Sequence, residues 1–161
     1  MGSTAEKILG KKELLFQVEH LKKHGKKIVT CNGVFDIIHP GHIAFLEEAK
    51  AQGDILIVAV NTDSSVKENR GPSRPINKEI DRARVLAALA CTDYITLFGE
   101  KTPIPFLEKI KPDVHVNGSE YGENCIEAPT VKKNGGRIHM VKRIPGYSTT
   151  SIIEKTGQLG V

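Results

Sequence analysis

Short apolar runs alternate with longer segments of helical periodicity along most of the chain. The runs are rich in β-branched residues and are flanked by Gly, Asn or Asp, which is typical of buried strands. Strands are predicted at 28–31, 54–60, 94–97, 114–116 and 137–141. Helices are predicted between them at 43–51, 79–90, 102–110 and 127–133, with a last helix after Ser148-Thr149-Thr150. Segment 11–23 adds an N-terminal helix with an apolar stripe formed by Leu14, Leu15, Val18 and Leu21.

The alternation of strands and helices predicts the fold class. Short buried strands joined by helices form right-handed crossovers and a parallel sheet that is covered on both faces. We therefore predict an α/β fold, a Rossmann-like five-stranded parallel sheet flanked by helices, with the extra N-terminal helix outside the repeat. Ligands of such sheets bind at the carboxyl ends of the strands, where the strand order reverses. Four polar clusters directly follow predicted strands and should share this edge, namely 33–42, 61–63, 117–121 and 143–150.

Length and composition indicate one domain over residues 1–161. Residues 1–10 are expected to be flexible or partly tag-derived, because Met1-Gly2-Ser3 is typical of an expression remnant. No apolar run approaches the ~20 residues of a membrane span, and the first residues lack the apolar region of a signal peptide. The three cysteines follow no pairing pattern and suit a reducing compartment. We therefore predict a cytoplasmic protein with no membrane partner.

The formal net charge is +4, and basic residues are concentrated in 11–27 and 132–143. A nucleic-acid-binding protein is one alternative, but these basic runs lack the interleaved aromatic residues that stack on bases. A mild positive excess equally suits an enzyme that handles phosphorylated small molecules. No nucleic-acid partner is expected.

Two of the six histidines, His39 and His42, lie on either side of a Pro-Gly pair. Pro40 suits the first turn of a helix, so both imidazoles are predicted at a helix N-terminus, where free N–H groups favour phosphate. Gly33, just upstream, allows a ligand to approach the backbone closely. A helix cap or a surface pair is the alternative, and a zinc pair would need further ligands that the neighbouring sequence does not supply. The position directly after a predicted strand favours the phosphate site.

The segment Gly33-Val-Phe-Asp36, followed by His39-Pro-Gly-His42, resembles the signature of the HxGH nucleotidyltransferase superfamily. Gly146-Tyr-Ser-Thr-Thr-Ser151 resembles its second signature, at the start of the final helix. The segments "VAVNTDSSV", "RGPSRPIN" and "VNGSEY" are similar to the adenylyltransferase domain of ADP-heptose synthase, and the similarity extends from about 26 to 156. The resemblance implies an enzyme that transfers a nucleoside monophosphate from a nucleoside triphosphate to a phosphorylated acceptor.

By position, the resemblance implies a set of catalytic residues, His39, His42, Arg143 and Thr149. It implies nucleotide contacts from Gly33, Val34, Phe35, Gly41, Asn117, Gly118, Glu120, Tyr121, Ser148 and Thr150. Asn117 and Glu120 stand where the heptose enzymes usually have Lys and Asp. Acceptor-side contacts are expected from Asp36, Asn61, Asp63, Lys67, Arg70, Arg74 and Arg82. Asp36 is also predicted to order its turn by accepting backbone N–H bonds, and 67–75 to be an irregular basic loop that closes over the phosphates.

The predicted reaction transfers AMP from ATP to D-glycero-β-D-manno-heptose 1-phosphate and yields pyrophosphate and ADP-heptose, a lipopolysaccharide precursor. Mg²⁺ is expected on the triphosphate rather than in a protein metal cage. A cytidylyltransferase that uses CTP and glycerol 3-phosphate, or another phosphorylated alcohol or sugar, is the alternative within the superfamily. A non-catalytic nucleotide-binding sensor is the alternative of another class. The resemblance also suggests a homodimer.

Overall fold

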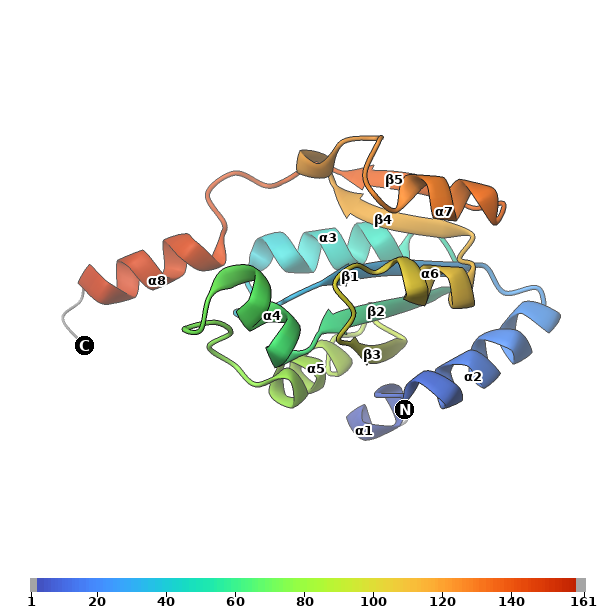
Figure 1. Cartoon of the computed structure of the whole chain (residues 1–161), viewed down its shortest axis with the longest axis horizontal. Helices are drawn as coiled ribbons and strands as arrows, with labels where there is room; N and C mark the ends of the chain where they lie inside the picture. The colour runs from blue at the N-terminus through green and yellow to red at the C-terminus, as the bar shows by residue number, and fades with distance from the viewer. Residues whose placement is uncertain (1–2, 159–161) are drawn as a thin grey trace.

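Five parallel strands form one sheet in the order β3-β2-β1-β4-β5, as the alternating pattern predicts. The structure is a computed structural model and describes residues 3–158 (Figure 1). The strands are β1 (Ile28–Gly33), β2 (Ile55–Asn61), β3 (Tyr94–Phe98), β4 (Val114–Gly118) and β5 (Arg137–Val141). The chain builds outward from β1 through β2 to β3 and then crosses back to β4 and β5. The strand order therefore reverses between β1 and β4.

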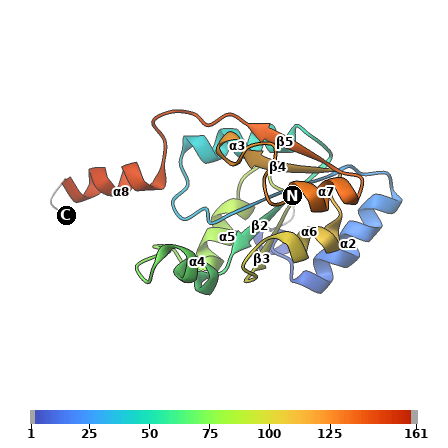
Figure 2. The same ribbon diagram turned by 45° about the horizontal axis from the view of Figure 1, so that its top comes forward.

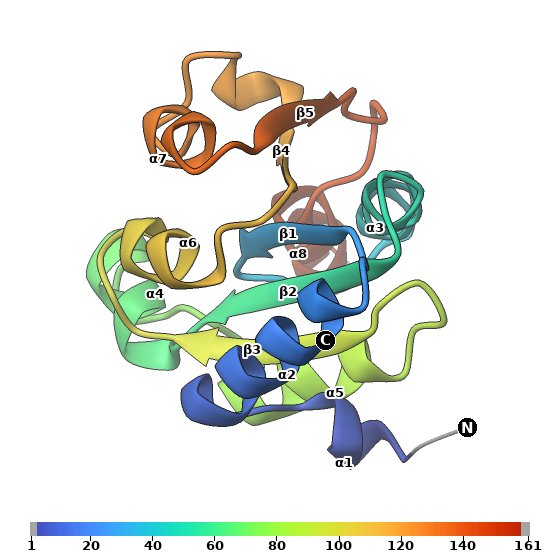
Figure 3. The same ribbon diagram turned by 90° about the vertical axis from the view of Figure 1, so that its right-hand side faces the viewer.

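Helices cover both faces of the sheet (Figure 3). One face carries α3 (Pro40–Lys50) and α5 (Glu79–Ala87), and the other carries α2 (Lys11–Lys23), α6 (Ile104–Ile110) and α7 (Ala128–Lys133). The shorter elements are α1 (Thr4–Lys7), α4 (Asp63–Arg70) and the 3-10 turn η1 (Ser119–Tyr121). The last helix, α8 (Thr149–Gln158), projects from the body on the side to which the strands point (Figures 1 and 2). Among residues 3–158, no helix is both long and apolar enough to cross a membrane.

The two faces of the strands build two apolar clusters, because successive strand residues point to opposite sides. Val29 of β1 packs with the helices α3 and α5, whereas its neighbour Ile28 packs beneath α2. Leu14 and Val18 of α2 are almost fully buried in this second cluster. The apolar stripe of the N-terminal helix therefore attaches that helix to the sheet.

Segment 3–10, which was expected to be flexible or partly tag-derived, contains α1 and pairs with the sheet. Ile8 forms a parallel bridge with Ile95 of β3. The physical reason is that β3 is an edge strand, with backbone groups free to pair with a passing segment. Met1 and Gly2, the start of the predicted tag remnant, lie outside the described residues.

The prediction of an irregular loop at 67–75 is wrong for its first four residues, which belong to α4. Thr62 caps this helix, and its Oγ1 accepts a hydrogen bond from the Ser65 N–H at 3.4 Å. Asn, Thr and Asp after a strand suit a turn and a helix cap equally, and the burial of Val66 stabilises the helix. Gly71 ends α4 with a φ of 89°, so that only 71–75 is irregular. The other predicted elements are confirmed, with boundaries shifted by up to three residues.

Candidate active site

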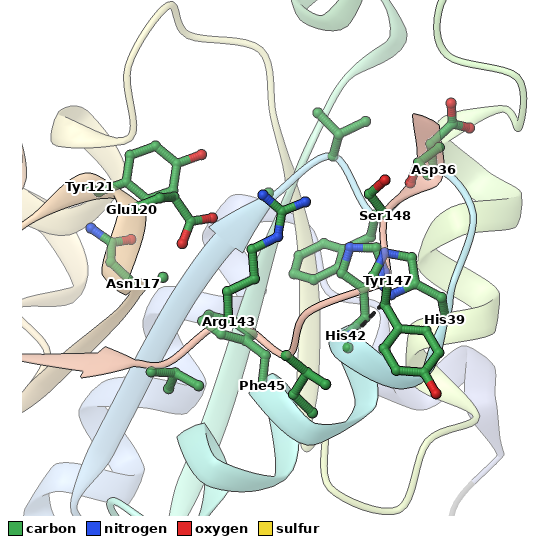
Figure 4. Close-up of a pocket in the computed structure, with 18 of the residues that line it drawn as sticks. Asp36, His39, His42, Phe45, Asn117, Glu120, Tyr121, Arg143, Tyr147 and Ser148 are labelled. Carbon is green, nitrogen blue, oxygen red and sulfur yellow. Dashed lines mark hydrogen bonds between the residues drawn. The ribbon is translucent and has the colours of Figure 1, made fainter. Parts of the chain in front are cut away.

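A cleft of about 360 Å³ opens at the carboxyl ends of the strands, beside the β1–β4 switch point (Figure 4). All the residues predicted as catalytic or nucleotide-contacting line it, namely Gly33, Val34, Phe35, His39, Gly41, His42, Asn117, Gly118, Glu120, Tyr121, Arg143, Ser148, Thr149 and Thr150. Of the predicted acceptor-side residues, Asp36 and Arg70 line the cleft. The others, Asn61, Asp63, Lys67, Arg74 and Arg82, do not. Segments far apart in sequence meet here because parallel strands end at one edge of the sheet.

His39 and His42 lie on the first turn of α3 and stack their rings. His39 is the N-cap residue, and Pro40 opens the helix. The His42 N–H donates to the His39 carbonyl at 2.9 Å and to the His39 ring Nδ1 at 3.4 Å. Because Nδ1 accepts this bond, the neutral His39 ring carries its proton on Nε2 and can donate it to a ligand.

The surroundings of both imidazoles favour their neutral form. Burial, and then the charge of Arg143, lower the pKa of His39 below its ordinary value. Burial, and then His39, lower the pKa of His42 to about 4. The Nδ1 of His42 is enclosed and has no hydrogen-bond partner among residues 3–158. The pair therefore enters the site as two polar rings rather than as fixed cations.

Two glycines leave room for the aromatic side chains around these rings. A Cβ on Gly41 would lie 3.1 Å from His39 Nδ1 and 3.3 Å from the Cβ of Tyr147. A Cβ on Gly33 would lie 3.0 Å from the ring of Phe35. Phe35 itself has a φ of 50°, and its ring lies 5.3 Å from that of His42. Glycine at both positions thus determines the shape of the loop that faces a ligand.

Asp36 accepts backbone N–H bonds, but from a distant segment rather than from its own turn. It is buried and accepts N–H bonds from Ile76 and Asn77 at 2.9–3.0 Å. Arg74 pairs with the same carboxylate at 3.3 Å. These contacts tie the loop after β1 to the segment before α5, and they keep Arg74 on Asp36 rather than in the cleft.

Arg82 is a buried residue that hydrogen bonds several segments together beside the site, and it does not line the cleft. Its Nε donates to the Asn77 carbonyl at 3.0 Å, and its terminal nitrogens donate to the Val34 carbonyl, the Asn61 carbonyl and the Asp63 carboxylate. The residue is 1% exposed. Every guanidinium nitrogen is engaged by the protein, so Arg82 connects the loop after β1 with the end of β2 and the start of α4.

The basic residues of α4 differ in their relation to the cleft. Arg70, in the last turn, lines it, whereas Lys67 is exposed on the same helix and does not. The helix was not expected from the sequence, and its rotation decides which of the two cations faces the cleft.

One wall of the cleft is formed by the end of β4 and by η1. Figure 4 shows Asn117, Glu120 and Tyr121 together on this wall, with Arg143 between them and the histidine pair. Asn117 is buried, whereas Tyr121 is 63% exposed. The Glu120 carboxylate packs so closely on Gly118 that a Cβ there would collide with it.

The opposite side includes the start of α8. Ser148 precedes the helix, and its Oγ accepts a hydrogen bond from the Ser151 N–H at 3.0 Å. Thr149 and Thr150 form the first turn. Both residues line the same cleft as the N-terminus of α3, so that two helix N-termini border one site that suits an anion.

Several cleft residues were not singled out from the sequence: Asn32, Phe45, Val141, Lys142, Ile144 and Tyr147. Tyr147 stacks near His39 with ring centroids 6.4 Å apart, and its place next to Ser148 could have indicated it. Phe45 follows His42 by one helical turn, a spacing that also could have indicated it. No sequence signal marks Asn32, whose Oδ1 is enclosed without a partner in the described part of the chain.

Two helix N-termini that face one cleft at the switch point of a parallel sheet are the arrangement expected of an HxGH nucleotidyltransferase. Comparison with known proteins leads to the same class, because residues 30–155 match the family described as Cytidylyltransferase-like. The chain belongs to this cytidylyltransferase-like family and is a nucleotidyltransferase.

The chain is similar to two relatives named Bifunctional protein HldE. The one from Pseudomonas paraeruginosa is 46% identical over 154 residues, which is 95% of this chain and 32% of the relative. The one from Marinomonas sp. is 49% identical over 149 residues, which is 92% of this chain and 31% of the relative. The chain thus spans about a third of the length of these relatives.

Two solved structures share the fold. The lipopolysaccharide core biosynthesis protein from Thermoplasma volcanium has a TM-score of 0.60 and 32% identity, and the match covers 74% of this chain and 98% of the other. The pantoate-beta-alanine ligase from Francisella tularensis has a TM-score of 0.62 over 96% of this chain and 78% of the other. Its identity is 16%, so this second match concerns the fold alone.

Proposed function

We propose that the protein transfers AMP from ATP to D-glycero-β-D-manno-heptose 1-phosphate, which yields ADP-heptose and pyrophosphate. The observation that supports this best is the single cleft shared by His39, His42, Arg143 and the N-terminus of α8. The similarity to Bifunctional protein HldE and to a lipopolysaccharide core biosynthesis protein supports a sugar phosphate as acceptor. The resemblance of the "RPIN" and "NGSEY" segments to ADP-heptose synthase supports a heptose acceptor and ATP.

In the proposed reaction, an oxygen of the acceptor phosphate attacks the α-phosphorus of the nucleotide. The new P–O bond forms while the bond between the α-phosphorus and the bridging oxygen breaks, and pyrophosphate leaves with the bonding electron pair. The acceptor phosphate is already ionised near neutral pH, so that the step needs no strong general base. Catalysis then depends on positioning and on stabilisation of the charge that develops at phosphorus.

The residues of the cleft divide this task. The His39 Nε2–H and the His42 ring would donate to the oxygens of the α-phosphate, at the positive end of α3. Arg143 would bind the β- and γ-phosphates, for which its forked and permanently charged head is suited. Ser148, Thr149 and Thr150 would hold the same phosphates from the start of α8.

Mg²⁺ is expected to enter with the nucleotide, bound by phosphate oxygens and water. Among residues 3–158, no group of three or more His, Cys, Asp or Glu side chains is arranged to hold a metal ion. The ion would supply neutralisation of the triphosphate charge, and Arg143 and the two helix N-termini would hold the complex.

The acceptor phosphate needs a cation of its own. Arg70 lines the cleft from α4, and we assign the acceptor phosphate to it, with Lys67 supporting from the same helix. Arg74 and Asp36 would fix the loop around the sugar, and Arg82 would fix the loop after β1 through Val34, Asn61 and Asp63.

A homodimer is also part of the proposal. α8 buries none of its residues in the chain described here, although its start lines the cleft. A second copy would cover this helix. A solution mass near 17.6 kDa, that of one chain, would contradict the dimer.

A panel of substrates tests the assignment. ATP, CTP, GTP and UTP are each combined with heptose 1-phosphate, mannose 1-phosphate and glycerol 3-phosphate, and pyrophosphate release is followed. The highest kcat/KM is expected for ATP with the heptose. Preference for CTP with glycerol 3-phosphate would replace the assignment with the cytidylyltransferase alternative. Failure of every pair, in a protein that binds ATP, would overturn the proposed transfer.

A further inference from the structure

The two ends of the cleft differ in their chemistry. His39, His42 and Ser148 lie at one end, and Asn117, Glu120 and Tyr121 lie at the other (Figure 4). The Glu120 carboxylate repels phosphate, so its end of the cleft suits the nucleoside rather than the triphosphate. This placement rests on the proposed function.

Asn117, in the wall at this nucleoside end, is held from behind by a second buried residue. Its Nδ2 donates to Oε2 of Glu127 at 3.1 Å, and the two residues are 6% and 7% exposed. A carboxylate oxygen accepts hydrogen bonds and an amide NH₂ donates them. The Glu127 carboxylate therefore orients the Asn117 amide with its nitrogen toward the protein.

The remaining polar atom of this amide, Oδ1, is available to a ligand. It makes no hydrogen bond within residues 3–158, and it is not among the enclosed polar atoms without a partner, which are Asn32 Oδ1, His42 Nδ1 and His115 Nε2. Since Asn117 lines the cleft, its accessible oxygen presents a hydrogen-bond acceptor at the nucleoside end.

The surroundings reinforce this orientation. Burial raises the pKa of the Cys125 thiol, while Asn117 and Glu127 lie close enough to affect it in opposite directions. His115, on the same strand as Asn117, forms a buried hydrogen bond of 2.8 Å between its Nδ1 and the Thr30 hydroxyl of β1. The neighbouring Asn117 side chain acts to raise the pKa of His115, against the larger effect of burial. The amide thus sits in an enclosed polar layer in which rotation would bring its oxygen against the Glu127 carboxylate.

We propose that Glu127 is a positioning residue for base selection: it fixes Asn117 so that Oδ1 accepts a hydrogen bond from the exocyclic amino group of the base. Adenine and cytosine carry such a group. Hypoxanthine, guanine and uracil carry a carbonyl oxygen at the corresponding position, which would face Oδ1 without a proton between the two oxygens.

The test compares ATP with ITP, which differ at this position of the purine. Equilibrium dissociation constants are measured with Mg²⁺ present, and kcat and KM are measured by pyrophosphate release. The wild type is expected to prefer ATP by about tenfold or more, because a buried acceptor left opposite another acceptor is costly. Glu127→Ala should free the Asn117 amide to rotate and so reduce the preference for ATP over ITP to about threefold or less. The change should appear in the KM for ATP, with little change in kcat.

Three variants complete the design. Glu127→Gln retains an acceptor oxygen for Asn117 and should keep the ATP preference. Asn117→Ala removes the acceptor oxygen and should lose the preference for ATP. This variant tests the inference if Glu127→Ala does not fold. Glu123→Gln, at an exposed position in the same segment, is the matched control and should behave as the wild type.

Equal affinity of the wild type for ATP and ITP would overturn the inference, as would an unchanged ratio in folded Glu127→Ala or Asn117→Ala. The inference would also be overturned if 2′-deoxy-ATP, and not ITP, bound more weakly than ATP, since Oδ1 would then bind the ribose. Because the preference for ATP over ITP is measured from dissociation constants, it does not depend on turnover. Selective binding without pyrophosphate release would support this inference and overturn only the proposed function.

Discussion

The imidazole rings of His39 and His42 stack with centroids 3.8 Å apart and planes 20° from parallel. The spacing of three residues across the first turn of α3 places both rings on one side of the helix start. Because a positive charge on one ring would lie close to the other ring at this distance, the stack favours two neutral rings. Two neutral rings can meet charge that develops in a transition state without repelling Arg143 beforehand.

Replacement of His42 by alanine is expected to lower kcat by about 10²–10³-fold, the usual effect of removing one preorganised donor to a transition state. The nucleotide dissociation constant should change little, because Arg143 and the α8 N-terminus remain. His24→Ala, at the exposed residue that directly follows α2, is the control. Single-turnover pyrophosphate release makes the measurement, and near-wild-type turnover by His42→Ala would remove this residue from the mechanism.

Arg143→Ala is expected to weaken ATP binding about 10–100-fold, the range for loss of charged hydrogen bonds. The same change should raise the pKa of His39, because the Arg143 charge contributes to lowering it. Calorimetry measures the affinity, and an NMR titration follows the His39 ring. Arg137→Ala, at the exposed first residue of β5, the strand that precedes Arg143, should alter neither quantity. A His39 pKa that stays fixed would contradict the predicted proximity of the two groups.

Arg82→Met is expected to reduce the free energy of unfolding by about 3 kcal/mol, because buried carbonyls and the Asp63 carboxylate lose their donor. Arg84→Met, two positions along the same helix and exposed, should stay within about 0.5 kcal/mol of the wild type. Urea unfolding compares the two. If Arg82→Met kept its stability and lost affinity for ATP or the acceptor instead, Arg82 would contact the substrate directly and would not be a structural residue.

Stability is expected to fall as the pH drops from about 6.5 to 4, in part because of His115. Burial lowers its pKa to about 4, whereas an unfolded histidine titrates near 6.5, so the unfolded chain binds the proton first. The loss due to His115 is on the order of 2–3 kcal/mol at pH 4. Urea unfolding at several pH values should show a shallower decline in His115→Gln than in the wild type. His42, shifted in the same direction, affects both proteins equally, and identical slopes would contradict the prediction.

Much of the site could be predicted because it depends on chain order. Residues that directly follow the strands of a parallel sheet reach the same edge whatever the details of packing. This holds for His39, Asn117 and Ser148, which come from three separate segments and line one cleft. Asp36 differs, because an aspartate in a turn is expected to accept nearby N–H groups, whereas its donors Ile76 and Asn77 lie 40 and 41 residues further along the chain.

The basic residues were harder to place because a cation in a polar segment carries no directional signal. Arg82 and Arg84 lie two positions apart on α5, yet one is fully enclosed and the other exposed. The enclosed one is satisfied by acceptors from other segments, among them Val34 and Asn61. That set of partners exists only after the loop after β1, the end of β2 and α5 have packed together.

The sequence by itself determined the strand–helix alternation, the edge at which the ligand binds, and the histidine and hydroxyl residues that meet there. Each of these follows from local periodicity or from spacing along the chain. The tertiary structure decided which cations reach the cleft, that the Tyr147 ring lies beside His39, and that Asn117 is hydrogen bonded to Glu127. These depend on how segments distant in sequence are rotated and enclosed against each other, which burial and hydrogen bonding settle only in the folded chain.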